Sequence, residues 1–225
     1  MISLVQRQFI NRLRQYGLSA TICQINKYLF RSLYKTHTDY IIILPSFSGK
    51  FLPHNEKIRS ISYVLVEDAF SRGTIPLATA ELLLSFLNEG SKGVCAVIDN
   101  ELAGYAWIQE SGIYHFGKAG IFTIPPGYAI LKNLYVLPKY RGRKLGLSLN
   151  RHRLSIIAPQ YTPIGFVIPD NRVAFRNWLP FGFQKVAFIK QWCWFNRKWH
   201  IRIKTLCNHD NLQAIIAAID LNPYA

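Results

Sequence analysis

The residues best suited to chemistry lie between Tyr135 and Leu149, where a strand-like apolar run stops at Pro138 and a basic loop leads into a second apolar run. Three cations and two glycines mark this loop: Arg141, Gly142, Arg143, Lys144 and Gly146. A strand, a glycine-containing loop and a helix in this order leave free backbone N–H groups at the helix N-terminus, where anions bind readily. The cations add full charges, and the glycines let an anion approach the backbone. The segment therefore predicts an anion site.

Apolar patterns around this loop predict the elements that would position it. We expect strands over residues 40–44, 58–66, 93–98, 102–109, 129–136, 164–168, 183–195 and 198–206, and helices over residues 77–87, 143–158 and 171–179. Asp99 and Asn100 tolerate the positive φ of a tight turn, so they predict a hairpin between the third and fourth of these strands. Residues 1–35 have the apolar spacing of two short helices that break at Gly17.

The basic loop resembles the signature of the GNAT superfamily of acyl-CoA-dependent N-acyltransferases, in which a strand ending in Val-x-Pro precedes Arg/Gln-x-x-Gly-x-Gly/Ala at a helix start. Arg141 and Gly146 match its first and last positions, whereas Lys144 stands where the family usually has its middle glycine. A second stretch, Asn171 to Ala174 followed by Gly182-Phe183, is similar to the family's Asn-x-x-Ala helix that closes in Gly-Phe. Two motifs in the right order are more specific than either alone.

The resemblance implies an α/β (mixed α+β) fold of three layers, in which a central, splayed, mixed β-sheet is flanked by helices, with extra N-terminal helices. We expect a basic helical extension and strand over residues 1–56, a GNAT-like acyltransferase domain over 57–206, and a C-terminal helix or tail over 207–225.

The resemblance also implies where acyl-CoA, either acetyl-CoA or a longer thioester, would bind. The pantetheine arm would pair with the backbone of Leu134 to Val136, and Asn171 and Trp178 would lie at its sulfur end. The pyrophosphate would bind the amides of the loop, contributed by Arg141, Gly142, Arg143, Lys144, Leu145 and Gly146. A backbone N–H near Val136 would polarise the acyl carbonyl.

The catalytic groups are less clear, because Trp178 stands where the family usually has its tyrosine acid and an indole is not a usable acid. The strand over residues 129–136 contains no carboxylate and offers Lys132, Asn133 and Tyr135. A direct attack still requires a neutral amine and a proton for the leaving thiolate. The base or acid could be Glu110, His115 or Tyr135, or ordered water could act alone. Each of these residues could equally be an ordinary surface or hydrogen-bonded core residue.

Charge indicates an anionic partner, because 27 Lys+Arg face 12 Asp+Glu and give a net charge of +15. The first acidic residue is Asp39, and none occurs between Ser111 and Pro169. A CoA thioester, an acidic acyl carrier protein, nucleic acid and an anionic membrane surface all fit, the last two through the basic N-terminus.

The four cysteines lack the C-x-x-C spacing of a zinc site or a disulfide framework, so we expect no metal and a reducing, cytoplasmic location. No apolar run approaches the roughly 20 residues that span a bilayer.

The sequence therefore favours an N-acyltransferase, with acetyl the simplest acyl group, that acts on the primary amine of a small molecule or peptide in a ternary complex. Three alternatives stay open: fatty-acyl transfer to a peptide amine from CoA or acyl carrier protein, acylation of an RNA-linked amine, and a GNAT-fold binding module that has lost catalysis. The sequence leaves the oligomeric state open.

Overall fold

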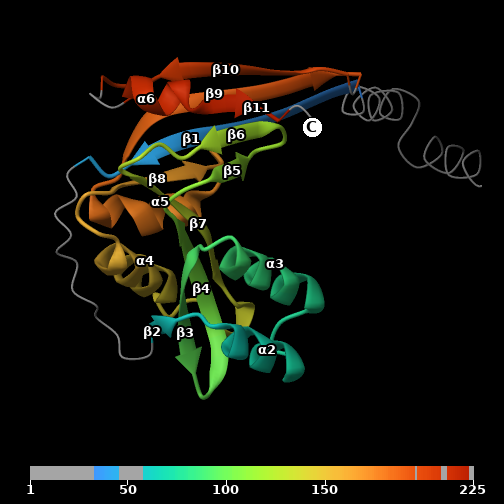
Figure 1. The fold of residues 1–225 in the computed structure, drawn as a ribbon, viewed down its shortest axis with the longest axis vertical. Helices are drawn as coiled ribbons and strands as arrows, with labels where there is room; N and C mark the ends of the chain where they lie inside the picture. Colours follow the sequence, from blue (N-terminus) through green and yellow to red (C-terminus); the bar gives the residue numbers. More distant parts are fainter. Residues whose placement is uncertain (1–32, 46–57, 196, 209–211, 223–225) are drawn as a thin grey trace, which may run out of the picture.

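The computed structural model describes residues 33–45, 58–195, 197–208 and 212–222. An eight-stranded sheet forms its centre, in the order β10-β9-β1-β8-β7-β4-β3-β2 (Figure 1). The strands are β1 (Tyr34–Ile43), β2 (Ile58–Ser60), β3 (Lys92–Ile98), β4 (Glu101–Gln109), β7 (Tyr128–Val136), β8 (Thr162–Val167), β9 (Gln184–Trp194) and β10 (Trp199–Thr205). A mixed sheet flanked by helices confirms the expected fold class.

Helices cover both faces of this sheet. Helices α2 (Tyr63–Ser71) and α3 (Leu77–Asn88) pack on one face, where Leu83 and Trp107 are buried together. Helices α4 (Leu145–Ile156) and α5 (Arg172–Trp178) pack on the other face, around Leu149 and Leu154. Among the described residues, no helix has both the length and the apolar character that crossing a bilayer requires.

The sheet splits between its two parallel strands. Strands β7 and β8 pair only over Tyr128–Ile130 and Thr162–Ile164. Beyond Ile130, β7 keeps its partner β4 on one side, whereas no strand of the described residues pairs with its other edge. The resemblance predicted this splay, and the open edge belongs to the residues that precede the basic loop.

A β-bulge on β7 adjoins the split. Tyr105 of β4 pairs with Tyr135, but Trp107 pairs with Lys132, so β7 contains one extra residue between these pairs. The extra residue is accommodated at Asn133, whose φ of 46° is in the left-handed region. The bulge bends β7 where it parts from β8.

A second, three-stranded sheet in the order β11-β6-β5 packs against the inner face of β1, β9 and β10. It consists of β5 (Ile113–Phe116), β6 (Gly120–Thr123) and β11 (Ile219–Leu221), and helix α6 (Leu212–Ala217) precedes β11. Gln191 of β9 is fully buried, and its side-chain oxygen accepts hydrogen bonds from the amides of Lys118 at 2.8 Å and Ala119 at 3.1 Å. This side chain fixes the β5–β6 turn to the main sheet.

Most of the elements expected from the sequence are confirmed, including the hairpin at Asp99 and Asn100, which both have positive φ. The strand expected over 58–66 is wrong beyond Ser60, because the side chain of Ser62 accepts a hydrogen bond from the Leu65 amide and begins α2. The helical interpretation of residues 1–35 is wrong at Tyr34 and Lys35, which begin β1, and residues 1–32 lie outside the described part.

Candidate active site

The basic loop ends at an uncapped helix N-terminus. After β7, a single 3-10 turn, η1 (Pro138–Tyr140), leads to Lys144, the N-cap of α4, whose side chain makes no capping hydrogen bond. Because the first amides of a helix have no intrahelical acceptor, those of Leu145 and Gly146 are available to an anion. Gly142 has φ of 80° and open space where a Cβ would lie. The loop therefore has the geometry of a phosphate site.

The individual loop side chains have different positions. Arg141 folds back on the end of β7, where its Nε donates to the Val136 carbonyl at 3.1 Å and its guanidinium lies 5.6 Å from the Tyr135 ring centre. Arg143 and Lys144 are exposed, and Leu145 is buried, so only its backbone faces the loop.

Gly146 has a packing role that the sequence did not reveal. A Cβ at this position would lie 2.8 Å from Nδ2 of Asn177, so the missing side chain lets α5 approach α4. Asn150 reinforces this contact by donating to the Asn177 carbonyl at 3.0 Å. The glycine therefore allows α4 and α5 to pack closely beside the loop, and it also leaves its amide available to an anion.

The open edge of β7 offers backbone groups to a ligand. The Leu137 amide donates to Ala103 of β4 at 2.9 Å, and backbone groups alternate in direction along a strand. The polar groups of Val136 and Leu134 therefore point away from β4, toward the gap that β8 leaves. An extended chain in this gap could pair with them, although the Val136 carbonyl already accepts from Arg141.

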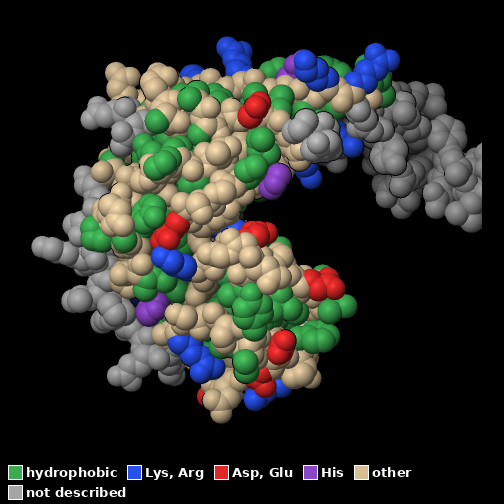
Figure 2. All heavy atoms as spheres, in the orientation of Figure 1, with side chains coloured by type: hydrophobic (Ala, Val, Ile, Leu, Met, Phe, Trp, Pro, Cys, Tyr) green, Lys and Arg blue, Asp and Glu red, His purple; other side chains and the backbone are tan. Residues whose placement is uncertain are grey.

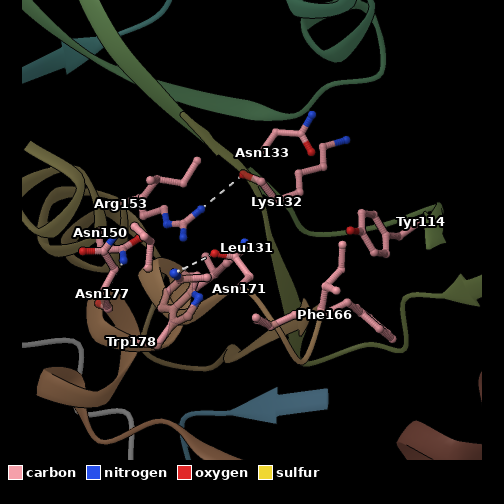
Figure 3. A pocket seen from close by; sticks show the side chains of 15 residues that line it. Tyr114, Leu131, Lys132, Asn133, Asn150, Arg153, Phe166, Asn171, Asn177 and Trp178 are labelled. Atoms are coloured by element: carbon pink, nitrogen blue, oxygen red, sulfur yellow. Dashed lines mark hydrogen bonds between the residues drawn. The ribbon is translucent and has the colours of Figure 1, made fainter. Parts of the chain in front are cut away.

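A pocket of about 290 Å³ lies in the gap between β7 and β8, beside α4 and α5 (Figure 3). Asparagines and cations give it polar character: Lys132, Asn133, Asn150, Arg153, Asn171 and Asn177. None of its lining residues is acidic. Asn171 caps α5, because its Oδ1 accepts from the Ala174 amide at 3.0 Å, and the same residue lines the pocket. We call this space the donor-side pocket.

Trp178 supports a buried cation. The guanidinium of Arg153 lies 4.4 Å from the centre of the Trp178 ring and is fully buried. Its Nη1 donates to the carbonyls of Trp107 at 3.3 Å and Lys132 at 3.2 Å, which flank the β7 bulge. Burial lowers the pKa of Arg153 to about 9, so the group is still charged at neutral pH. The indole thus packs on the cation that bonds to the backbone beside the bulge.

A second pocket, of about 330 Å³, lies on the α3 side of β7, where Figure 2 shows the surface hollowed between the small sheet and α3. Its lining includes Phe86, Glu89, Gln109, Tyr114, His115, Lys132 and Asn133. Three residues line both pockets: Tyr114, Lys132 and Asn133. We call this second space the acceptor-side pocket, and the two pockets meet at these three side chains.

The three catalytic candidates occupy different places. His115 lines the acceptor-side pocket. Glu110 forms an ion pair with Lys92 at 2.7 Å and lines neither pocket. Tyr135 packs on Tyr105, with ring centres 5.7 Å apart, and also lies outside both pockets. The structure therefore brings only one of the three to the junction region.

Lys132 is a buried cation at the junction. Its Nζ donates to Gln109 Oε1 at 2.8 Å, lies 3.3 Å from Glu89 Oε2, and sits 4.1 Å from the Phe86 ring centre. Desolvation lowers its pKa, although Glu89 partly opposes that effect. A lone lysine in the apolar segment 129–136 was the sequence signal for this position.

Tyr114 is the functional candidate that sequence reasoning missed. It comes from β5, and its ring packs against Phe166 of β8 with the centres 5.3 Å apart. Burial and the charge of Asp39 raise its pKa to about 12, so its hydroxyl keeps its proton. No local motif marks this residue, because the small sheet alone brings it to the gap (Figure 3). Among the described residues, no group of His, Cys, Asp and Glu could hold a metal ion.

Comparison with known proteins identifies the family. The sequence profile of the acetyltransferase (GNAT) family matches residues 59–183, which include the β7 wall of both pockets, the α4 wall of the donor-side pocket and the basic loop. No curated protein matches the chain.

Three solved structures illustrate the likeness. One is described as a GNAT-family acetyltransferase from Novosphingobium aromaticivorans (TM-score 0.51, 16% identity, 77% of this chain and 66% of that one). Another is a ribosomal-protein-alanine N-acetyltransferase from Brucella melitensis (TM-score 0.40, 15%, 66% and 99%). The third is an aminoglycoside N-acetyltransferase in complex with CoA (TM-score 0.38, 19%, 57% and 91%). The profile match covers more than half of the sequence, and the chain therefore belongs to the GNAT acetyltransferase family.

Proposed function

We propose that this protein transfers a short acyl group from a CoA thioester to a primary amine, by direct attack in a ternary complex. The observation that carries the proposal is the junction of two pockets at Tyr114, Lys132 and Asn133, next to the open edge of β7. A donor in one pocket and an acceptor in the other would place their reacting atoms at this junction. Family membership supports acetyl as the simplest group.

The donor side suits CoA. The uncapped N-terminus of α4 and the exposed Arg143 and Lys144 would bind the pyrophosphate. The pantetheine arm would then follow the open backbone of Leu134 and Val136 toward Asn171. The α4 N-terminus, the open edge of β7 and Asn171 would all contact CoA from the same side of β7. The thioester at the end of the arm would therefore lie at the bulge, where the two pockets meet.

The proton transfers have candidates at the junction. The amine nitrogen forms the new C–N bond while the C–S bond breaks, with its electron pair passing to sulfur. The amine gives up its proton to ordered water or to His115, which lines the acceptor-side pocket. The hydroxyl of Tyr114, which lines both pockets and keeps its proton, would donate a hydrogen bond to the departing sulfur, and the thiolate would take up the proton that the amine releases. Tyr114 would thus take the part of the tyrosine that Trp178 replaces.

The character of the donor-side pocket favours a short acyl group. Four asparagines and two cations contribute to its wall, and an aliphatic chain that contacts them would desolvate polar groups without replacing their hydrogen bonds. Fatty-acyl transfer, from CoA or from an acidic carrier protein, is therefore the second choice.

A panel of acyl-CoAs from two to sixteen carbons, read as free thiol released with pooled amines, tests the proposal. We expect a maximum at two to four carbons. The Tyr114→Phe variant should lower kcat by about 10²-fold and leave CoA affinity unchanged. Tyr135→Phe is the matched control, because Tyr135 lies outside both pockets, and it should be close to wild type.

Three results would contradict the proposal. A rate maximum at eight carbons or beyond would indicate fatty-acyl transfer. Activity with acyl carrier protein alone would show that the carrier protein, and not CoA, is the donor. CoA binding without thiol release from any donor would favour a binding module that has lost catalysis.

A further inference from the structure

One part of the large sheet has an outer face on which no helix packs within the described part of the chain. Helices α4 and α5 pack against the strands beside the split, whereas β9, β10 and the first half of β1 extend beyond them (Figure 1). The inner face of these strands is covered by the small sheet and α6, around Ile189 and Ile215. Their outer face carries the alternate residues of each strand.

The register of the strands arranges these outer residues in rows. Lys204, Phe188 and Tyr40 form one row, Arg202, Lys190 and Thr38 the next, His200, Trp192 and Thr36 the third, and Trp194 and Tyr34 the last. Ring contacts confirm this arrangement, because Trp192 stacks on His200 at 5.4 Å and 20° and Trp194 lies 4.5 Å from Tyr34. We call this set of residues the aromatic–basic face.

The charges on this face have one sign. Lys190, Arg202 and Lys204 are exposed, and Lys185 lies 4.4 Å from the Tyr40 ring centre on the same side. None of the face's own residues is acidic. Asp39, the acidic residue of β1, points to the other side and pairs with His37 at 3.0 Å. Figure 2 shows Lys and Arg side chains gathered along this end of the molecule.

Cations and rings in alternating rows fit single-stranded nucleic acid. Successive rows on one sheet face are two residues apart, roughly 7 Å along the strand. Bases stack on exposed aromatic rings, while Lys and Arg neutralise the phosphates between them. The row of Lys190 and Arg202 lies between the row of Trp192 and His200 and the row of Phe188 and Tyr40, whose Tyr40 ring also contacts Phe175 of α5. The hydroxyls of Thr36 and Thr38 add polar groups beside the rings.

Other occupants match the face less well. A second copy of this chain carries a net charge of +15, and the segment of residues 1–33, which precedes β1, contains no acidic residue, so the cations of the face would repel both. A membrane would need the rings to enter the lipid while the cations stay at the headgroups. The sheet holds both kinds of side chain at one level, because they alternate within it.

We propose that the aromatic–basic face binds single-stranded nucleic acid. This inference does not depend on acyl transfer. The test uses the full chain and a labelled twelve-nucleotide oligouridine, with fluorescence anisotropy measured from 50 to 300 mM salt. Four cations predict a slope of log affinity against log salt near −3, since each neutralised phosphate of a single strand contributes about −0.7.

Variants connect the binding to the face. Lys190→Ala should make the slope shallower by about 0.7. Trp194→Ala, which changes a ring that is 44% exposed, should weaken binding by about 5- to 150-fold. Lys35→Ala is the matched control, because Lys35 belongs to β1, is exposed and points to the other side. It should change the affinity less than Lys190→Ala.

Three outcomes of these experiments would contradict the proposal. Equal effects of Lys35→Ala and Lys190→Ala would show attraction by net charge alone. Equal affinity for a blunt duplex would exclude base stacking. Stronger binding to vesicles containing phosphatidylserine, lost in the same variants, would assign the face to a membrane surface. A thermal melt of each variant separates these outcomes from misfolding.

Discussion

Lys144 combines a strained backbone with a charge at the anion site, and substitutions can separate the two. Its φ of 58° and ψ of 16° lie in the left-handed region, which disfavours every residue with a side chain relative to glycine. The family usually has a glycine there, which matches this conformation. Replacing Lys144 with glycine removes strain and charge together, whereas replacement with alanine removes the charge alone.

The expected stability effect follows from two opposing free energies. Left-handed backbone costs a residue with a Cβ about 1–2 kcal/mol. Glycine also gives the unfolded chain more backbone conformational freedom, and this entropy lowers the gain in stability by about 0.4–1 kcal/mol. Lys144→Gly should therefore raise the free energy of unfolding by about 0.5–1 kcal/mol. For a chain of this size, this change corresponds to an increase in Tm of roughly 1–4 °C. Lys144→Ala should leave the strain in place and give no such gain.

The affinity for CoA should respond differently. If the Lys144 ammonium binds the pyrophosphate, both variants lose a charged hydrogen bond of about 1.5–3 kcal/mol, and CoA affinity should fall at least tenfold in each. Thermal unfolding and calorimetric titration of the three proteins measure both quantities. Equal stability of the glycine and alanine variants would refute the strain argument. Loss of affinity in the alanine variant alone would show that backbone approach, not charge, governs binding.

Three further perturbations test other parts of the fold. Gly104→Ala would place a Cβ 2.8 Å from the Tyr135 carbonyl oxygen, so it should lower the free energy of unfolding by about 1–3 kcal/mol in denaturant titrations; an unchanged midpoint would contradict the tight β4–β7 contact. Burial raises the pKa of Cys95 to about 11, so mass mapping with a thiol reagent at pH 8 should find Cys207 labelled before Cys95, and equal labelling of these two would show that the core opens. Gln191→Ala leaves two turn amides unpaired and should cost about 1–3 kcal/mol, with faster amide hydrogen exchange at the β5–β6 turn; unaltered exchange would disprove the link.

Local patterns predicted the elements near the anion site well. The Asp99-Asn100 turn, the strand before Pro138 and the helix after the basic loop each depend on residues close in sequence. The error at residues 58–66 has the same origin, because the capping side chain of Ser62 outweighs an alternating pattern.

The parts of the candidate site that could not be predicted from the sequence depend on contacts between residues far apart in the chain. Trp178 at the position of the family's tyrosine was visible in the sequence, but its contact with the buried guanidinium of Arg153 depends on how α4 and α5 pack. Tyr114 could not be found locally, because a strand from residues 219–221 completes the sheet that brings it to the pockets. The backward fold of Arg141 onto Val136 likewise arises from the path of the loop.

The position of β1 also has a consequence for the order in which this chain can fold during synthesis. Strand β1 lies between β8 and β9, which begin at Thr162 and Gln184. A ribosome adding roughly 5–20 residues per second releases β9 roughly 7–30 s after β1. Until β8 has been made, both hydrogen-bonding edges of an apolar strand, Tyr40 to Ile43, have no native partner, and one edge still has none until β9 follows; such edges promote aggregation. The nascent chain must therefore keep this strand covered by other means until its later half has been made.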